Sequence, residues 1–269
     1  MLRVGVLGAG GRMGRVVCQA VADDPALELV AAVDPRLAGI DLRQATGVDV
    51  GGLQVGGDAG DLARAGTEVA VDFTVAEAAV DHLRWCAANG VHAVVGTTGI
   101  REPTMAELAE AFSRSDANAV VAANFAIGAV LMMRFAELAA PFMDGVEIVE
   151  VHHDGKLDAP SGTALRTAER MEAARRAAGA PALPPDRTTT EVAPGARGAA
   201  GAGGVRIHAV RLPGVVSHQE VVFGAVGQTL VLRHDAYDRS SYMPGVLLAV
   251  KHVAGRPGLT VGLDAFLGF

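Results

Sequence analysis

Strand-like and helix-like segments alternate through the first 125 residues, and this alternation constrains the fold more than any other feature. Short runs rich in valine and alanine, typical of buried strands, are separated by longer runs with the spacing of amphipathic helices. The expected strands are residues 2–7, 28–33, 69–73, 92–95 and 119–123, and the expected helices are residues 12–22, 76–88 and 103–114. A chain of this kind places its strands in parallel and its helices on both faces of the sheet. The sequence therefore predicts a doubly wound parallel sheet of the α/β class.

After residue 125 the strands cluster instead of alternating with helices. A helix is expected at residues 126–140 and a strand at residues 146–151. Three further strands are expected close together, at residues 205–212, 218–223 and 228–234. Because strands joined by short turns pair in antiparallel or mixed fashion, residues 126–235 should form a second, α+β domain with a mixed sheet.

The remaining stretches are less regular. Residues 34–60 are rich in glycine and aspartate without a clear period, and residues 181–204 have the proline, glycine and alanine content of a loop. A last helix is expected at residues 242–254, and we expect residues 236–269 to return to the first domain, which is otherwise residues 1–125.

The composition excludes several classes of function. The formal net charge of −7 argues against a nucleic-acid-binding surface. The longest uncharged run, residues 117–133, is interrupted by asparagine and glycine, so no membrane span is expected. Cys18 and Cys86 lack the spacing of a disulfide or metal motif, and the first residues already have a strand pattern rather than the layout of a signal peptide. We therefore expect a cytoplasmic protein with reduced cysteines.

A glycine-rich loop lies between the first expected strand and the first expected helix. Gly8, Gly11 and Gly14 follow a GxxGxxG spacing rather than the strict GxGxxG. In this position glycines permit a tight turn and let a pyrophosphate approach backbone N–H groups closely. A simple tight turn is the alternative, but in this position the pattern favours a Rossmann-type dinucleotide site with these residues: Gly8, Ala9, Gly10, Gly11, Arg12 and Met13.

The second expected strand carries a residue that bears on the choice of dinucleotide. Asp34 ends this strand, where a carboxylate can accept hydrogen bonds from the adenosine ribose hydroxyls of NADH. Arg36 can instead pair with the 2′-phosphate of NADPH, and Arg12 is a second candidate for a phosphate contact. Both NADH and NADPH therefore remain open.

Two more loops follow strands at the carboxyl edge of the predicted sheet, where ligands bind in such folds. One contains Gly96, Thr97 and Thr98, and the other contains Ala122, Ala123, Asn124 and Phe125. These loops can line the nicotinamide ribose and amide, although ordinary strand-to-helix turns have similar sequences.

The segment between Glu147 and Ala164 combines a strand end, a turn and a helix start. His152 and His153 end the strand, Lys156 follows the turn, and Ser161 can cap the next helix. The helix start and the lysine charge suit a carboxylate or phosphate, and an imidazole can transfer protons. A surface loop with incidental histidines is the alternative. Metal binding is not expected, because adjacent strand residues point to opposite faces.

This segment resembles the characteristic segment of the dihydrodipicolinate reductase family, the 4-hydroxy-tetrahydrodipicolinate reductases. The matching positions are Glu147, Ile148, Glu150, His152, Lys156, Asp158, Pro160, Ser161, Gly162, Thr163 and Ala164. The glycine loop, the loops at residues 96–99 and 123–125 and the region 233–239 are also similar to that family. The resemblance therefore extends over nearly the whole chain.

The resemblance implies a homotetramer that reduces 4-hydroxy-tetrahydrodipicolinate, via dihydrodipicolinate, to tetrahydrodipicolinate in bacterial lysine and diaminopimelate biosynthesis. It implies NADH or NADPH as the cofactor, bound by the glycine loop, Asp34 and the loops at residues 96–98 and 122–125. It implies His152 as a proton donor and acceptor and Lys156 as a proton donor. It also implies a dicarboxylate substrate bound by His153, Ser161, Gly162 and Thr163.

Two departures from the family pattern concern charge. Family members often carry Glu-Arg where this chain has Asp34-Pro35, which weakens the case for NADPH unless Arg36 compensates. Asp154 and Gly155 stand where basic or imidazole side chains are frequent, so Asp154 either weakens the positive field or points outward.

Other functions remain possible from the sequence. Another Rossmann oxidoreductase acting on an amino-dicarboxylate would share the cofactor domain without requiring the whole His-His-Lys and Ser-Gly-Thr arrangement. An NAD-sensing regulator would need a partner or DNA surface, and it would leave His152 and Lys156 unexplained. Arg197 and Arg239 are further candidates for contacts with the substrate or a neighbouring subunit.

Overall fold

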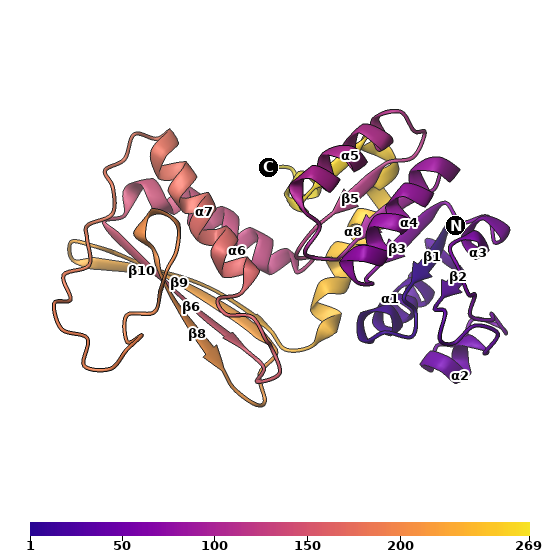
Figure 1. Ribbon diagram of the computed structural model, residues 1–269, viewed down its shortest axis with the longest axis horizontal. Coiled ribbons are helices and arrows are strands. Elements are labelled where there is room, and N and C mark those ends of the chain that lie inside the picture. The colour runs from indigo at the N-terminus through magenta and orange to yellow at the C-terminus, as the bar shows by residue number, and fades with distance from the viewer. The chain divides into compact units, whose positions relative to one another are not determined.

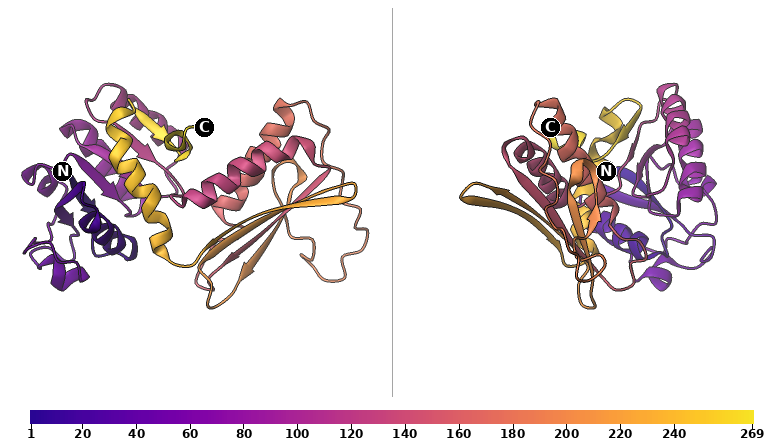
Figure 2. Two further views of the ribbon diagram at one scale, coloured as in Figure 1. Left: turned by 180° about the vertical axis from the view of Figure 1, so that it is seen from behind. Right: turned by 60° about the vertical axis from the view of Figure 1, so that its left-hand side comes forward.

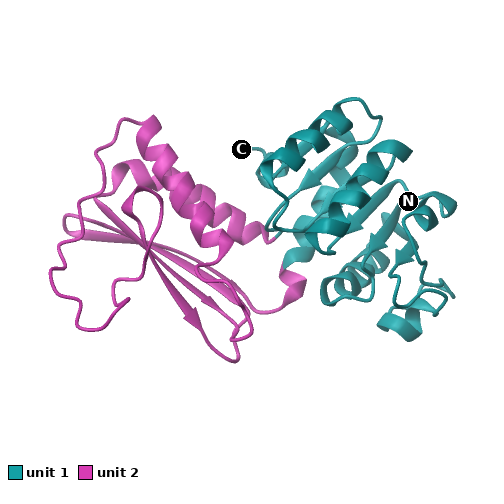
Figure 3. Ribbon diagram, viewed as in Figure 1, with its two compact units in different colours: residues 1–125, 242–269 teal, residues 126–241 magenta.

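The computed structural model describes all 269 residues, which form two compact units (Figure 3). Unit 1 comprises Met1–Phe125 and Tyr242–Phe269, and unit 2 comprises Ala126–Ser241. Unit 2 extends beyond the boundary predicted at residue 235, because its last strand continues through Ala236 and a 3-10 helix follows it. No helix combines the length and the apolar character that crossing a membrane would require.

Unit 1 contains one sheet and the helices that cover it (Figure 1). Its strands are β1 (Leu2–Leu7), β2 (Leu27–Val33), β3 (Val69–Asp72), β4 (His92–Val95), β5 (Ala119–Val121) and β11 (Leu259–Val261). Its helices are α1 (Arg12–Asp23), α2 (Leu42–Thr46), α3 (Gly60–Arg64), α4 (Ala76–Asn89), α5 (Glu102–Ser113), α8 (Met243–His252), the 3-10 helix η4 (Val253–Gly255) and α9 (Asp264–Leu267).

The six strands of unit 1 are parallel and follow the order β11-β5-β4-β3-β1-β2. The chain proceeds from β1 outward to β2 and then places β3 on the other side of β1. This confirms the predicted doubly wound sheet. The reversal of strand order puts the switch point between β1 and β3, where ligands bind outside the carboxyl ends of the strands.

The helices of unit 1 cover both faces of its sheet (Figures 1 and 2). Helices α3, α4 and α5 bury Leu62, Leu83, Leu108 and Phe112 against one face. Helices α1 and α8 pack together on the other face, where Val17, Val246 and their neighbours are buried. Each such side chain removed from water contributes about 1.5–3 kcal/mol. Apolar packing therefore holds the carboxyl edge of the sheet in a fixed position.

Several short elements of unit 1 have no counterpart in the predictions. Helices α2 and α3 contain five residues each and lie in the stretch that lacks a clear period. Helix α2 begins at a local signal, because the side chain of Asp41 accepts a hydrogen bond from the backbone N–H of Gln44 at 3.2 Å. Strand β11 contains only three residues and pairs with β5. Elements this short do not produce a detectable period.

Unit 2 consists of a five-stranded sheet and two long helices. Its strands are β6 (Gly145–His152), β7 (Ala199–Ala200), β8 (Arg206–Arg211), β9 (Ser217–Ala225) and β10 (Gln228–Ala236). Its helices are α6 (Ile127–Ala139) and α7 (Gly162–Ala177), with the 3-10 helices η1 (Ala140–Phe142) and η2 (Ala202–Gly204). A further 3-10 helix, η3 (Arg239–Tyr242), crosses the boundary to unit 1.

The sheet of unit 2 is mixed, as predicted. Its order is β10-β9-β6-β8-β7, and the central β6 is parallel to β8 and antiparallel to β9. Helices α6 and α7 lie together on one face of this sheet (Figures 1 and 2). Alternate residues of β6, namely Val146, Ile148 and Glu150, are buried. The buried carboxylate of Glu150 is therefore part of an otherwise apolar row.

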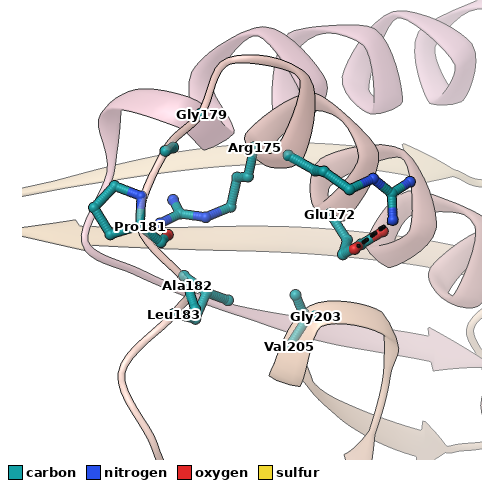
Figure 4. Close-up of a pocket in the computed structure, with 10 residues that line it drawn as sticks. Glu172, Arg175, Gly179, Pro181, Ala182, Leu183, Gly203 and Val205 are labelled. Atoms are coloured by element: carbon teal, nitrogen blue, oxygen red, sulfur yellow. Dashed lines mark hydrogen bonds and ion pairs between the residues drawn. The ribbon is translucent and has the colours of Figure 1, made fainter.

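Arg175, near the end of α7, has its side chain directed toward Pro181 in the segment that follows the helix (Figure 4). Its guanidinium is buried and donates hydrogen bonds to the backbone carbonyls of Ala140, Met143 and Pro181. A cavity of about 350 Å³ lies beside it, lined partly by the segment that follows α7. The cavity is at the opposite end of α7 from Ser161, and the contacts of Arg175 indicate a structural role.

Replacing Arg175 with methionine should lower the free energy of unfolding by about 2–4 kcal/mol, because buried carbonyls lose a charged donor. Arg176 provides a matched control on the same helix. Its side chain is 72% exposed and pairs with Glu172, so Arg176→Met should change stability by no more than about 0.5 kcal/mol. Urea denaturation of both variants measures the difference, and equal losses would contradict the assigned role of Arg175.

Candidate active site

The glycine loop after β1 is held at the edge of the unit 1 sheet. Gly8 has a φ of +75°, a conformation that favours glycine. The N–H groups of Gly8 and Ala9 donate to the carbonyl oxygen of Val33 at 2.8 and 3.0 Å. Helix α1 starts directly after this turn, at Arg12, and the N–H groups of a first helical turn have no acceptor within the helix. The predicted loop therefore places a helix start, with N–H groups suited to an anion, at the switch point.

Close approach of α1 to this loop depends on Gly14. A Cβ atom at Gly14 would lie 2.0 Å from the carbonyl oxygen of Gly8 and 2.8 Å from the Cα of Ala9. A Cβ atom at Gly10 would lie 2.7 Å from Oδ2 of Asp34. Side chains at these positions would fill the space between the glycine loop, α1 and Asp34. Because both residues are glycines, the loop leaves room for the pyrophosphate of a dinucleotide.

Asp34 is anchored to the glycine loop. Its Oδ2 accepts a hydrogen bond from the N–H of Gly10 at 3.1 Å, and its Oδ1 accepts one from the N–H of Arg36 at 3.1 Å. Each carboxylate oxygen keeps further acceptor capacity for a ribose hydroxyl. The side chains of Arg12 and Arg36 are exposed and form no ion pair, and each follows a residue of this contact, Gly10 or Asp34, by two positions.

The other two predicted cofactor loops follow β4 and β5 at the same edge of the sheet. Thr97 is buried, and its hydroxyl donates to the carbonyl oxygen of Thr74 at 2.9 Å. The N–H of Ala122 donates to the carbonyl oxygen of Val95 at 3.0 Å. Thr97, Thr98 and Ala123 line one cavity of about 410 Å³, whose other walls come from α5 and β11. The structure therefore brings these two loops together around one cavity.

Asp72, at the end of β3, supports the glycine loop and has no role in the sequence predictions. Its buried carboxylate accepts hydrogen bonds from the backbone N–H and hydroxyl of Thr74 at 2.7 and 2.6 Å, and it pairs with Nδ1 of His82 at 2.7 Å. A Cβ atom at Gly8 would lie 2.9 Å from Cγ2 of Thr74. Asp72 thus fixes the β3 loop against the glycine loop. The sequence signal that could have indicated this role is an acidic residue at the end of a buried strand.

His152 is the last residue of β6 and is part of a hydrogen-bond network in unit 2. Its Nδ1 is 2.6 Å from Oε2 of Glu150, whose side chain is fully buried. Its Nε2 is 3.0 Å from the hydroxyl of Ser217 on β9. Arg211, from β8, donates to both oxygens of Glu150 at 2.9 Å each. Neither Glu150 nor Arg211 was assigned a function from the sequence, although period-two alternation places Glu150 on the buried face with Ile148.

Burial and charge act in opposite directions on this network. Burial lowers the pKa of His152 below its usual range, although the hydrogen bond and charge of Glu150 act to raise it. Burial raises the pKa of Glu150, but the hydrogen bonds from Arg211 and His152 outweigh it and leave that pKa below its ordinary value. The carboxylate therefore remains ionised at neutral pH, and the lowered pKa of the imidazole favours its neutral form.

Lys156 lies in the turn between β6 and α7. Its Nζ contacts both carboxylate oxygens of Asp158, at 2.7 and 2.9 Å. The hydrogen bond from Lys156 holds the pKa of the Asp158 carboxyl below its usual range. The Lys156 side chain is 21% exposed, whereas that of Asp158 is 63% exposed, so Asp158 can move away from the ammonium group into solvent. Asp154 is exposed and forms no ion pair.

Helix α7 starts at the predicted position. The hydroxyl of Ser161 accepts a hydrogen bond from the backbone N–H of Ala164 at 3.2 Å, which confirms Ser161 as the N-cap. The N–H of Ser161 itself donates to Oε1 of Glu150 at 3.0 Å. Gly162 and Thr163 form the first turn, where the positive end of the helix dipole favours a carboxylate. His153 is half-buried, and its N–H donates to the carbonyl oxygen of Val216.

Comparison with known protein families identifies the family to which this chain belongs. Residues 2–125 match the family model described as the N-terminus of dihydrodipicolinate reductase, and residues 128–267 match the one described as its C-terminus. The chain belongs to the dihydrodipicolinate reductase family. The sequence resemblance is thereby confirmed, and the protein is an NAD(P)H-dependent oxidoreductase.

Relatives of the family match over the full length. The 4-hydroxy-tetrahydrodipicolinate reductase of Nocardia farcinica is 50% identical over 268 residues, which cover 99% of this chain and 98% of the relative. A dipicolinate-bound dihydrodipicolinate reductase from Paenisporosarcina sp. TG-14 is 37% identical, with a TM-score of 0.85 and coverage of 98% and 99%. An amine dehydrogenase from Mycobacterium smegmatis is only 18% identical, with a TM-score of 0.66 and coverage of 98% and 95%, and it shares the fold alone.

Proposed function

We propose that this dihydrodipicolinate reductase family member reduces 4-hydroxy-tetrahydrodipicolinate, via dihydrodipicolinate, to tetrahydrodipicolinate in lysine and diaminopimelate biosynthesis. The observation that carries the proposal is the arrangement at the β6–α7 junction. A proton-transferring imidazole, a lysine and the start of a long helix lie within one strand–turn–helix unit. A dicarboxylate with a reducible conjugated C=C–C=N system requires these groups, namely sites for two negative charges and a proton source.

In this proposal unit 1 is the cofactor domain. The backbone from Gly8 to Met13 holds the pyrophosphate, and Asp34 holds the adenosine ribose. The loops at residues 96–98 and 122–125 surround the nicotinamide end of the cofactor. A bound nicotinamide cofactor supplies the hydride that reduces the conjugated C=C–C=N system. Thr97 and Ala123 form part of the wall at that end of the site.

Unit 2 is the substrate domain in this proposal. One substrate carboxylate binds at the first turn of α7, through Ser161, Gly162 and Thr163, where a helix start contributes about 0.3–1 kcal/mol and more when buried. Lys156 exchanges Asp158 for the second carboxylate or the ring nitrogen. His153 contacts the bound substrate. His152 moves a proton through its imidazole, and Lys156 is a second proton donor.

The test is a coupled assay in which the upstream synthase generates 4-hydroxy-tetrahydrodipicolinate in the reaction mixture. We expect oxidation of NADH or NADPH that requires both the synthase and this protein. The absence of oxidation with either cofactor would refute the proposed reaction. An amino-dicarboxylate dehydrogenase would instead oxidise its cofactor with a keto-dicarboxylate and ammonia.

Arg36 should determine how well the protein uses NADPH. An exposed guanidinium beside the Asp34 loop can pair with a 2′-phosphate, which NADH lacks. Arg36→Ala should raise the KM for NADPH by about 10-fold and leave the KM for NADH unchanged, because one charge-assisted hydrogen bond contributes about 1.5–3 kcal/mol. Arg43→Ala, which removes an exposed arginine that pairs with Asp49, is the control. Equal changes for both cofactors would contradict this role.

We also propose that the protein is cytoplasmic and assembles as a homotetramer. Both cysteines are free and buried, and free cysteines are typical of proteins in a reducing compartment. On the sheet face of unit 2 that α6 and α7 leave uncovered, Val210 and Val231 are 38% and 48% exposed. A second copy of the chain would cover these side chains. Light scattering during gel filtration tests the assembly, and a monomer would refute it.

A further inference from the structure

The carboxylate of Glu150 is the centre of the unit 2 network. It is 0% exposed, and it accepts four hydrogen bonds from three directions. Oε1 accepts from the N–H of Ser161 and from Arg211, while Oε2 accepts from Arg211 and from His152. A buried carboxylate with all these contacts links the end of β6 to the start of α7 and to β8.

We propose that Glu150, paired with Arg211, is a positioning residue that fixes the tautomer and charge of His152 and aligns the substrate-binding start of α7. This inference rests on the proposed function, in which His152 transfers protons at the substrate. Glu150 is too deeply buried to contact the substrate itself, and it acts through His152 and Ser161.

The tautomer follows from the chemistry of the contact. An ionised carboxylate can only accept hydrogen bonds, so Nδ1 of His152 carries the hydrogen and donates to Glu150. In the neutral ring Nε2 is then the acceptor, and it faces the hydroxyl of Ser217 at 3.0 Å. The nitrogen that gains and releases the proton is therefore Nε2.

Arg211 sets how strongly Glu150 acts on the ring. The groups that face His152 are Glu150 from its own strand, Arg211 from β8, Lys156 with its partner Asp158 from the following loop, and the uncharged Ser217 from β9. Arg211 forms a two-pronged contact with Glu150 and so neutralises most of its charge. Without Arg211, the carboxylate would have the imidazolium as its main counter-charge.

The same carboxylate also positions α7. Its Oε1 binds the N–H of Ser161, the N-cap residue, and Arg211 additionally donates to the carbonyl oxygen of Asp158 in the preceding loop. The proton-transferring ring and the helix start are thus attached to one group. A shift of Glu150 would move both at once.

Two substitutions with opposite electrostatic effects test the proposal. In Glu150→Gln, the amide oxygen can still accept the hydrogen bonds from the N–H of Ser161 and from one nitrogen of Arg211. The NH₂ group then faces Nδ1 of His152 as a donor. We expect ¹⁵N NMR of the histidine side chains at neutral pH to show the hydrogen on Nδ1 in the wild type and on Nε2 in the variant. The titration midpoint of His152 should fall by about one pH unit or more.

Arg211→Gln should instead raise the His152 midpoint, because a positive neighbour is lost and Glu150 is no longer neutralised. Arg211→Lys, which keeps the charge, should stay near the wild-type midpoint. Glu147→Gln, on the opposite face of β6, is the matched control and should leave both the tautomer and the midpoint unchanged. If Glu150→Gln does not fold, the comparison of Arg211→Gln with Arg211→Lys still shows whether loss of the positive charge raises the His152 midpoint. Shifts of the same sign in Glu150→Gln and Arg211→Gln, or unchanged midpoints, would overturn the proposal.

Turnover provides the second readout. In Glu150→Gln, kcat should fall by about 100-fold with an unchanged KM for NADH, because general acid–base catalysis contributes about 10²–10⁴-fold. A loss confined to stability, with normal kcat in the folded fraction, would also overturn the positioning role. The NMR experiment needs no substrate. An inactive wild type would therefore refute the proposed reaction without affecting the NMR result.

Discussion

Replacing His152 with alanine should lower kcat by about 10²- to 10⁴-fold while the affinity for NADH stays within about 2-fold of the wild type. The imidazole is the only titrating group at the end of β6 that has a buried carboxylate on one nitrogen and a hydroxyl on the other. Its removal deletes the proposed proton donor and leaves the glycine loop of unit 1 intact. Lys156→Ala should follow the same pattern, with an added rise in the substrate KM from the lost carboxylate contact.

Turnover and binding need separate measurements for this prediction. Steady-state kinetics in the coupled assay gives kcat, and quenching of NADH fluorescence gives cofactor affinity without any substrate. His252→Ala, which changes an exposed histidine at the end of α8, is the control and should behave as the wild type. Loss of cofactor binding with normal turnover at saturating cofactor would contradict the role of His152.

Replacing Gly14 with valine should abolish detectable cofactor binding. The Cβ atom of the valine would lie 2.0 Å from the carbonyl oxygen of Gly8. Rotation of the side chain cannot relieve this clash, because the Cβ atom is fixed by the backbone of residue 14 and the oxygen belongs to the backbone of Gly8. Either α1 moves away from the loop or the loop loses its shape, and in both cases the anion-binding N–H groups are displaced. Overpacking of this kind also costs about 1–3 kcal/mol of stability.

Gly255→Ala separates this effect from the general cost of replacing a glycine. A Cβ atom at Gly255 meets no atom within 4 Å, and this residue lacks a positive φ. We expect Gly255→Ala to bind NADH normally and Gly14→Val to show no saturable quenching of NADH fluorescence. Normal binding by a folded Gly14→Val variant would show that the loop does not hold the pyrophosphate.

The parts of the fold that the sequence predicts are those with local signals. The alternation of valine-rich strands with amphipathic helices predicts the parallel sheet, and Ser161 before a helical run predicts the start of α7. Helices α2 and α3 are five residues long, and β11 is three residues long, so they give no period to detect. Their existence depends on contacts with the rest of unit 1.

In the candidate site, too, the parts with a local sequence signal are predictable and the parts formed by distant residues are not. The glycine loop and the His152–Lys156 segment are contiguous, so residue type and spacing are enough to predict a role for each. Glu150 has a partial signal, because it alternates with the buried Val146 and Ile148. Its partner Arg211 is 61 residues away, and only the parallel pairing of β6 with β8 brings the two together. A buried pair of this separation has no signature in a single sequence.

The most direct test of the central claim is to follow the hydride itself. With 4-hydroxy-tetrahydrodipicolinate generated in the mixture and with NADH deuterated at the transferred position of the nicotinamide ring, mass spectrometry should find tetrahydrodipicolinate carrying one carbon-bound deuterium. The His152→Ala variant should form the same labelled product about 10²-fold or more slowly. Product that lacks deuterium, or no product from the wild type, would contradict the proposed reaction.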